Sequence, residues 1–208
     1  MMDLDGRVAI VTGASAGIGE AVARELVGQG ASVVINARRS ERLDALKAEL
    51  DAAQGAECVA TVAGDCSDDA VIATMFDAAE SAFGKPADLV VVNAGRGLAG
   101  SVVSSDKAEW EEVVRTNLLG AASLMRASAE RMTADRESVS SGSGWADQPR
   151  DSVVLGAVVG RHVSPFSSMY GSTKFAVHSL AEALRREIGP NGVRVTLVEP
   201  AVVVSEFQ

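Results

Sequence analysis

Residues 7–30 read RVAIVTGASAGIGEAVARELVGQG, and this stretch sets the interpretation of the rest of the chain. Its first part, residues 7–14, is a Val- and Ile-rich run that predicts a strand buried on both faces, as in a parallel sheet. A glycine-rich turn follows, and then an amphipathic helix that stops at Gly28 and Gly30. In such an arrangement, backbone N–H groups at the helix N-terminus can hold a phosphate. The spacing is G-x-x-x-G-x-G rather than G-x-G-x-x-G, so the turn could also be a tight connection without a ligand.

The alternation of strand and helix continues along the chain. We expect further strands at 32–37, 56–62, 88–92, 152–159 and 192–198, and helices at 40–54 (capped by Ser40), 68–83, 106–132 and 165–188. This pattern predicts one α/β domain over residues 1–208: a doubly wound parallel sheet of the Rossmann type with helices on both faces. Ligands of such sheets bind beyond the carboxyl ends of the strands. At or just past those ends lie Gly13, Arg38, Asp65, Asn93, Ala157 and Pro200.

Composition argues against several classes of protein. The formal net charge is −9 and no run of Lys or Arg is present, which argues against a nucleic-acid surface. No apolar stretch approaches the roughly 18–20 residues of a membrane span, and the N-terminus lacks the basic start and cleavage site of a signal peptide. Cys58 and Cys66 have no metal-ligand spacing near them. We therefore expect a cytoplasmic protein with reduced cysteines and with no metal, membrane or nucleic-acid partner.

The predicted helix 165–188, PFSSMYGSTKFAVHSLAEALRREI, brings a phenol and an amine together. Tyr170 and Lys174 lie four residues apart, so both project from the same side of the helix. A neighbouring positive charge favours the phenolate, so we expect the pKa of Tyr170 to fall below the ordinary value of ~10. Such a tyrosine can give a proton to an alkoxide or take one from an alcohol. By itself the pair could also be an ordinary helix surface.

Two segments depart from the alternation. Residues 133–151, TADRESVSSGSGWADQPRD, are polar and without periodicity, which predicts a long surface loop anchored by Trp145. Either a lid over the ligand or a simple insertion fits this loop. The chain stops at Gln208, soon after the sixth strand, which would leave that strand at an unpaired edge of the sheet.

Taken together, these pieces resemble the short-chain dehydrogenase/reductase family over essentially the whole chain. The motifs that carry the resemblance are Thr12-Gly13-x3-Gly17-Ile18-Gly19, Asn93-Ala94-Gly95, Asn117 within RTNLLG, Tyr170-x3-Lys174, and Pro200 after the sixth strand. They occur in the family's order and at the predicted strand ends. Family members continue through a substrate-covering loop, a helix and a seventh strand, so we expect that a tail is missing from these residues.

The resemblance implies a role for each of these positions. Tyr170 would exchange the proton while hydride moves at the nicotinamide, Lys174 would bind the nicotinamide ribose, and Asn117 would anchor a water that links Lys174 to solvent. Asp65 would accept from the adenine amino group. The other implied cofactor-binding residues are Gly13, Ser15, Gly17, Ile18, Gly19, Asn93, Ala94, Gly95, Pro200, Val203 and Ser205. Alternatively, Asp65 could cap a helix and Asn117 could satisfy buried backbone groups.

The end of the second strand bears on the choice of cofactor. Enzymes that prefer NAD usually carry an acid there, which binds the ribose hydroxyls. This sequence instead has Ala37, followed by Arg38 and Arg39. Guanidinium groups bind a 2′-phosphate bidentately, whereas an acid would repel it. We therefore predict NADP(H); the alternative is that both arginines form a solvated surface pair.

One expected residue is missing. The family places a serine thirteen positions before the tyrosine, where its hydroxyl binds the substrate carbonyl, and this chain has Ala157 there. Losing one such preorganised donor typically costs ~3–4 kcal/mol of transition-state stabilisation. The replacement could be deliberate, could mark a slow or divergent reductase, or could mark a protein that kept only nucleotide binding.

These observations predict an NADP(H)-dependent oxidoreductase that interconverts a small-molecule carbonyl and a secondary alcohol, with Tyr170 as acid and base and with activity impaired at Ala157. The alternative is a catalytically silent nucleotide-binding or sensor protein on the same fold. The long helices at 106–132 and 165–188 carry Ala, Leu and Val on their outer sides, which favours a homodimer or homotetramer.

Overall fold

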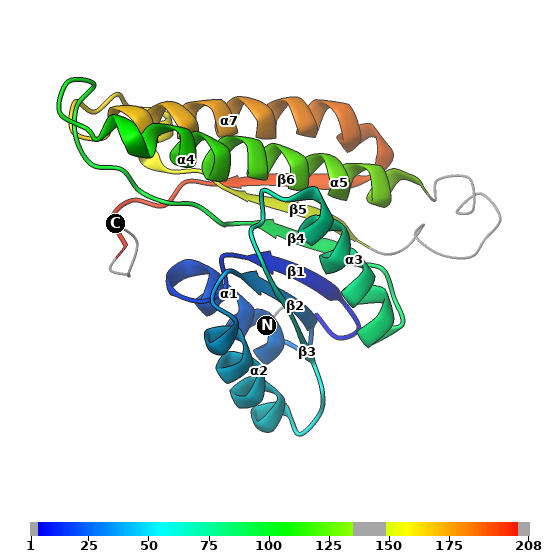
Figure 1. The fold of residues 1–208 in the computed structure, drawn as a ribbon. Helices are drawn as coiled ribbons and strands as arrows, with labels where there is room; N and C mark the ends of the chain where they lie inside the picture. The colour runs from blue at the N-terminus through cyan, green and yellow to red at the C-terminus, as the bar shows by residue number, and fades with distance from the viewer. Residues whose placement is uncertain (1–3, 135–148, 204–208) are drawn as a thin grey trace.

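A six-stranded parallel sheet forms the centre of the protein (Figure 1). The structure is a computed structural model that describes residues 4–134 and 149–203. The strands lie in the order β3-β2-β1-β4-β5-β6. Their bounds are Val8–Thr12 (β1), Ser32–Ala37 (β2), Val59–Ala63 (β3), Leu89–Val92 (β4), Arg150–Leu155 (β5) and Val193–Val198 (β6). Each neighbouring pair is parallel, which confirms the predicted doubly wound sheet.

The strand order reverses beside β1. The chain builds outward from β1 to β2 and β3, and then returns to place β4 on the other side of β1, with Val11 opposite Val91. Strands β5 and β6 extend the sheet from there. In sheets of this kind the ligand crevice lies at the carboxyl ends of the strands where the order reverses. The turns after β1 and β4 therefore mark the expected ligand-binding edge.

Helices cover both faces of the sheet, as predicted (Figure 1). On one face lie α1 (Gly17–Gly28) and α2 (Ser40–Gln54); on the other lie α3 (Asp69–Phe83), α4 (Trp110–Val114), α5 (Ala121–Ala134) and α7 (Ser168–Ile188). Alternate residues of β1 serve two hydrophobic cores: Val8 and Ile10 pack with α3, α5 and α7, whereas Ala9 and Val11 pack with α1 and α2. Burial on both faces explains why this strand is an unbroken apolar run in the sequence.

Several predicted strand boundaries are wrong. The fifth strand spans Arg150–Leu155 rather than 152–159, because the chain turns into a short 3-10 helix, η4 (Val158–Gly160), three residues later. The third strand begins at Val59 rather than at residue 56. β-branched side chains outside a strand, such as those of Val158 and Val159, resemble strand residues in a sequence pattern, but tertiary contacts decide where pairing stops.

The helix predictions also need correction. The predicted helix 106–132 is a continuous helical run, but it consists of a 3-10 turn η1 (Lys107–Glu109), α4, a π-helix η2 (Arg115–Gly120) and α5. The predicted helix 165–188 begins only at Ser168. Ser40 does not cap α2: Arg39 occupies the N-cap position, and no side chain there makes a capping hydrogen bond.

Strand β6 forms one edge of the sheet, as predicted, and within the described ranges it pairs with β5 alone.

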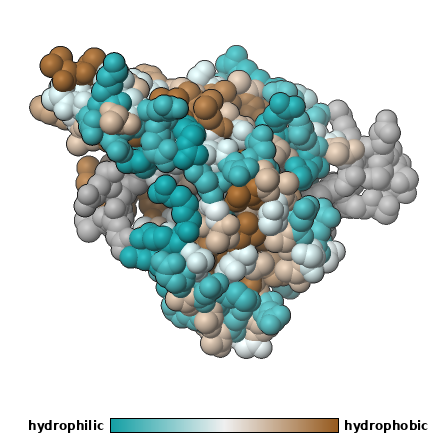
Figure 2. All heavy atoms as spheres, viewed as in Figure 1, coloured by the Kyte–Doolittle hydropathy of each residue, from teal (hydrophilic) through white to brown (hydrophobic). Residues whose placement is uncertain are grey.

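Figure 2 shows a surface on which polar residues surround small apolar patches. Residues 135–148 of the predicted loop 133–151, with Trp145, and also Ser205, fall outside the described residues. No helix in the part of the chain that the structure describes is long and apolar enough to cross a membrane.

Ion pairs join the strands at the end of the sheet opposite the ligand-binding edge. The Nε atom of Arg7 lies 2.6 Å from Oδ1 of Asp88, and its Nη2 atom lies 3.0 Å from Oδ2 of Asp151. The side chains of Arg7 and Asp88 are 11% and 4% exposed, whereas Arg194, which pairs with Asp151 at 2.6 Å, is 63% exposed. The network therefore has a buried part and a solvated part.

Removing the buried partner should destabilise the protein more than removing the exposed one. We expect Asp88→Ala to lower the free energy of unfolding by about 3 kcal/mol, because it leaves the buried Arg7 guanidinium incompletely compensated. The matched control, Arg194→Ala, should cost no more than about 1 kcal/mol, since its ion pair is exposed. Urea denaturation of both variants measures the difference. Equal losses would mean that burial does not distinguish these pairs.

Candidate active site

The glycine turn after β1 permits a close backbone approach. Gly13 and Gly17 have φ angles of +69° and +61°, in the left-handed region that favours glycine. At Gly19 a Cβ atom would lie 2.3 Å from the carbonyl oxygen of Gly13 and 2.5 Å from Nδ2 of Asn93, so no larger residue fits without a backbone shift. Ala16 occupies the N-cap of α1 and has no capping side chain. The first backbone N–H groups of this helix therefore have no side-chain acceptor at the N-cap, so they can donate hydrogen bonds to a bound anion.

Asn93 ties the end of β4 to the end of β1. Its Nδ2 atom donates a hydrogen bond to the carbonyl oxygen of Thr12 at 2.8 Å. In return, the Thr12 hydroxyl oxygen accepts from the backbone N–H groups of Asn93 and Ala94, each at 3.1 Å. Asn93, Ala94 and Gly95 line the cavity described below, at positions set by these hydrogen bonds.

The two arginines after β2 have different surroundings. The Nη2 atom of Arg39 donates to the Ser15 hydroxyl at 2.9 Å, so this side chain braces the glycine turn. Arg38 has a 68% exposed side chain, and its Nη1 atom lies 3.7 Å from Oε1 of Glu112. The two therefore do not form a solvated surface pair: Arg39 contacts the turn, and Arg38 lines the cavity with a largely exposed side chain.

Asp65 lies just beyond β3 as an ionised acceptor. Its Oδ1 atom accepts from the N–H and the hydroxyl of Ser67 at 2.9 and 2.7 Å, and its Oδ2 atom lies 2.8 Å from Nη1 of Arg115. Burial alone would raise the pKa of Asp65, but these hydrogen bonds outweigh it and lower that pKa. Asp65 does not cap α3. Asp68 does so, by accepting from the N–H of Ala70 at 2.8 Å.

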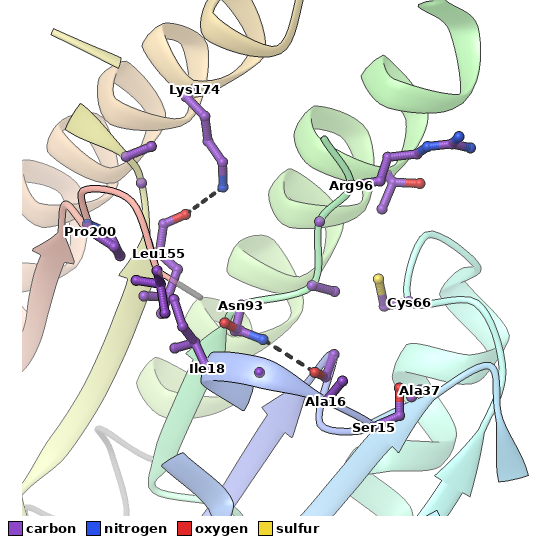
Figure 3. Close-up of a pocket in the computed structure, with 18 of the residues that line it drawn as sticks. Ser15, Ala16, Ile18, Ala37, Cys66, Asn93, Arg96, Leu155, Lys174 and Pro200 are labelled. Atoms are coloured by element: carbon purple, nitrogen blue, oxygen red, sulfur yellow. Dashed lines mark hydrogen bonds between the residues drawn. The ribbon is translucent and has the colours of Figure 1, made fainter. Parts of the chain in front are cut away.

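Tyr170 and Lys174 line the same cavity, as their spacing predicts. Lys174 is 5% exposed, and its Nζ atom donates a hydrogen bond to the carbonyl oxygen of Leu155 at 2.8 Å (Figure 3). The same Nζ atom lies 5.9 Å from the centre of the Tyr170 ring. Burial lowers the pKa of Lys174 to about 8. Burial also raises the pKa of Tyr170, so the predicted lowering is wrong for this structure. Desolvation disfavours both charged forms, and the ammonium contacts a carbonyl oxygen rather than the phenol.

Asn117 is 1% exposed and lies in the π-helix η2. Its Oδ1 atom accepts from the N–H of Arg96 at 2.8 Å. Its Nδ2 atom donates to the carbonyl oxygen of Arg96 at 2.9 Å and to Oγ1 of Thr173 at 3.1 Å. Asn117 therefore satisfies buried backbone groups, which was the structural alternative, and joins the turn after β4 to α7. Its role in anchoring a water stays a prediction.

Ala157 lies two residues beyond the end of β5, in extended backbone with φ −168°. It lines the cavity and is 7% exposed. Nearby serines do not supply the missing hydroxyl: Oγ of Ser164 accepts from the N–H of Phe166 at 3.2 Å, and Oγ of Ser168 donates to the carbonyl oxygen of Gly100 at 3.2 Å. Neither serine lines the cavity.

These segments enclose one cavity of about 930 Å³ at the carboxyl ends of the strands (Figure 3). Its lining includes the predicted residues Gly13, Ser15, Gly17, Ile18, Arg38, Arg39, Asp65, Asn93, Ala94, Gly95, Ala157, Tyr170, Lys174, Pro200 and Val203. Gly19 and Asn117 do not line the cavity, but they contact residues that do: Gly19 lies against Gly13 and Asn93, and Asn117 accepts from the N–H of Arg96.

Sequence reasoning missed Cys66 and Arg96, although each directly follows a predicted site residue. Within the described ranges, no cluster of His, Cys, Asp and Glu could hold a metal ion.

Comparisons with known proteins agree with this fold. A family model described as short chain dehydrogenase matches residues 7–208. An uncharacterized oxidoreductase of Staphylococcus epidermidis is 30% identical over 197 residues, which are 95% of this chain and 78% of the relative. A short chain dehydrogenase/reductase from Burkholderia phymatum, solved in complex with NAD, matches with a TM-score of 0.85 and 32% identity over 99% of this chain and 69% of its own. An alcohol dehydrogenase from the archaeon Thermococcus sibiricus, complexed with 5-hydroxy-NADP, matches with a TM-score of 0.83 and 29% identity. The match covers 97% of this chain and 78% of that protein.

The burial of Lys174 should make stability depend on pH. Its pKa is about 8 in the folded protein, whereas an unperturbed lysine titrates near ~10.4. Between these values the unfolded state binds more protons, so stability rises with pH. We expect the free energy of unfolding of the wild type, relative to Lys174→Met, to increase by roughly 2–3 kcal/mol from about pH 7.5 to about pH 10. Urea denaturation across this range measures the increase. A flat difference would show that the ammonium is not desolvated.

Proposed function

The chain belongs to the short-chain dehydrogenase/reductase family of oxidoreductases, and from that premise we propose that it uses NADP(H) to interconvert a carbonyl and a secondary alcohol. The observation that carries the proposal is that the glycine turn, Tyr170 and Lys174 all line the same cavity. A nucleotide held at the turn would lie in the same space as the phenol. The substrate would be a small molecule bound beside Tyr170 and Ala157.

The residues present fit a dinucleotide. The position of Gly19 leaves no space for a Cβ atom, and α1 begins without a side-chain cap. A volume of about 930 Å³ lies within the usual range of ligand pockets. The glycine turn would hold the pyrophosphate, Asp65 the adenine, and Lys174 the ribose of the nicotinamide, with Pro200 and Val203 near its carboxamide. When bound, the nicotinamide would supply or accept the hydride.

Tyr170 is the proposed acid and base. Its raised pKa keeps the phenol protonated near neutral pH, so in the direction of reduction its O–H can donate to the alkoxide as it forms. Lys174, held by the carbonyl oxygen of Leu155, has two further N–H donors for groups in the cavity. Asn117 would act by holding Thr173 and the turn after β4 in place. Because the side chain of Ala157 has no donor, the substrate oxygen would keep the Tyr170 hydrogen bond alone, which supports a reduced rate.

Two observations favour a second candidate, a catalytically silent nucleotide-binding or sensor protein. Ala157 gives no hydroxyl to a substrate carbonyl, and the amide of Asn117 is occupied within the protein. The retention of Tyr170 and Lys174 in the cavity supports the enzyme instead, since nucleotide binding alone does not need an acid and base.

We further propose a cytoplasmic homodimer or homotetramer. Leu119, between α4 and α5, is 57% exposed. It borders a hollow of about 340 Å³ that is also lined by Trp110, Glu111, Val114, Arg115 and Met169. A hollow on helices with exposed apolar side chains supports pairing with another copy.

The cofactor proposal predicts a selective effect at Arg38. Replacing this exposed guanidinium with an amide, Arg38→Gln, should weaken NADPH binding about tenfold and leave NADH binding almost unchanged, because one charge-assisted hydrogen bond to the 2′-phosphate is lost. The control is Arg126→Gln, whose side chain is 81% exposed on α5. Titration calorimetry gives both dissociation constants. Tighter binding of NADH than of NADPH by the wild type would contradict the proposal.

The reaction is tested by restoring the missing hydroxyl. Ala157→Ser should raise turnover of NADPH with a panel of small ketones at least about tenfold, because it adds one donor to the developing alkoxide. Adding Tyr170→Phe to this variant should abolish turnover while NADPH still binds. Loss of absorbance at the nicotinamide follows the reaction. NADPH binding without turnover, even after the serine is restored, would favour the silent nucleotide-binding protein.

A further inference from the structure

His178 fits a tight space in the wall behind the cavity. It lies one turn after Lys174 on the same side of α7, and its side chain is 10% exposed. A Cβ atom at Gly156 would lie 2.2 Å from its Nε2 atom, and one at Gly160 would lie 2.5 Å from the same atom. The ring therefore fits between these two backbone segments because both positions are glycine.

The imidazole accepts a hydrogen bond from the residue that follows Gly156. The backbone N–H of Ala157 donates to Nε2 of His178 at 3.2 Å. This nitrogen accepts only when it carries no proton, so the neutral ring is protonated at Nδ1. Nδ1 lies 3.9 Å from Oε1 of Glu199, the residue before Pro200.

The hydrogen bond replaces a strand contact where the sheet has ended. On either side of Ala157, the N–H of Gly156 donates to the carbonyl oxygen of Val198 at 2.8 Å, and the N–H of Val158 donates to that of Pro200 at 3.1 Å. Ala157 lies beyond β5, and its N–H donates to a side chain of α7 instead. The contact with His178 therefore adds a hydrogen bond at Ala157 itself, between the two backbone contacts of its neighbours, at the proposed substrate position.

We propose that His178 is a positioning residue: as the neutral Nδ1–H tautomer it holds the backbone of Ala157, and with it the substrate end of the cavity. His178 does not line the cavity, so it acts through Ala157 rather than on the substrate. Its effect on turnover rests on the proposed function, whereas the hydrogen bond and the tautomer do not.

Acid should break this contact. Burial lowers the pKa of His178 below its ordinary value; among the charged groups near the ring in the described residues, Glu199 opposes this shift, and Arg161 and Lys174 reinforce it. The ring is therefore neutral at physiological pH, and the contact is lost as pH falls through the folded pKa. A protonated Nε2 would place one donor against another at Ala157.

The tautomer can be measured on the whole wild-type protein by NMR. The chain has two histidines, and the exposed His162 is assigned with His162→Gln. In protein labelled with 15N-histidine, at neutral pH, two-bond 1H–15N spectra should show His178 protonated at Nδ1 and bare at Nε2. An Nε2–H tautomer, or a charged ring at this pH, would overturn the proposal whatever the activity of the protein.

Turnover tests the positioning itself in the Ala157→Ser background. His178→Leu removes the acceptor and should lower kcat/KM about tenfold. His178→Gln offers an acceptor near the place of Nε2, so it should recover most of the activity and abolish the fall at acid pH that the parent shows. His162→Gln should keep the activity and the pH profile of the parent. Parent-like kcat/KM in His178→Leu, or equal loss in the Leu and Gln variants, would overturn the proposal.

Amide exchange separates this inference from the proposed function. If no ketone is reduced even with serine at position 157, the proposed function fails, and His178 is still tested by the Ala157 amide of otherwise wild-type protein. Its protection should fall about tenfold in His178→Leu and return in His178→Gln. Unchanged protection in the Leu variant would overturn the proposal. Should His178→Leu fail to fold, the tautomer and its titration in the wild type decide.

Discussion

The ligand-binding edge depends on how closely the first helix approaches the ends of β1 and β4. A Cβ atom at Gly19 would meet both the carbonyl oxygen of Gly13 and the amide of Asn93. That amide is itself fixed by the carbonyl oxygen of Thr12, whose hydroxyl accepts from two backbone N–H groups of the next turn. The missing side chain at Gly19 and the hydrogen bonds between Thr12 and Asn93 therefore place the N-terminus of α1 at the cavity.

The two ends of the sheet are stabilised in different ways. At the end away from the cavity, Arg7 and two aspartates form ion pairs across the strands. At the cavity, the side-chain amides of Asn93 and Asn117 and the ammonium of Lys174 donate to backbone carbonyl groups. These hydrogen bonds go to neutral carbonyl groups, and no carboxylate of the described residues pairs with the Lys174 ammonium. Its positive charge is therefore available to a ligand in the cavity.

The architecture and the place of the site could be predicted from the sequence, because both follow from local rules. Strands buried on both faces are unbroken apolar runs, and residues just past parallel strand ends gather at one edge. Contacts between distant segments could not be predicted. Spacing placed Lys174 beside Tyr170, but only the fold brings the carbonyl oxygen of Leu155 to 2.8 Å from the ammonium. Desolvation likewise depends on the whole structure, and it reversed the expected direction of the Tyr170 pKa. The end of β5 was missed because Val158 and Val159 resemble strand residues. The chemical roles of the site residues stay predictions.

Arg38 and Arg39 are among the residues that line the cavity of a molecule whose net charge is −9. An anionic dinucleotide would therefore be repelled at a distance and attracted on contact. At physiological ionic strength the Debye length is about 8 Å, so dissolved salt weakens the distant repulsion more than the contacts. Added salt would then speed the arrival of the dinucleotide, which is the reverse of the usual behaviour of electrostatically steered association.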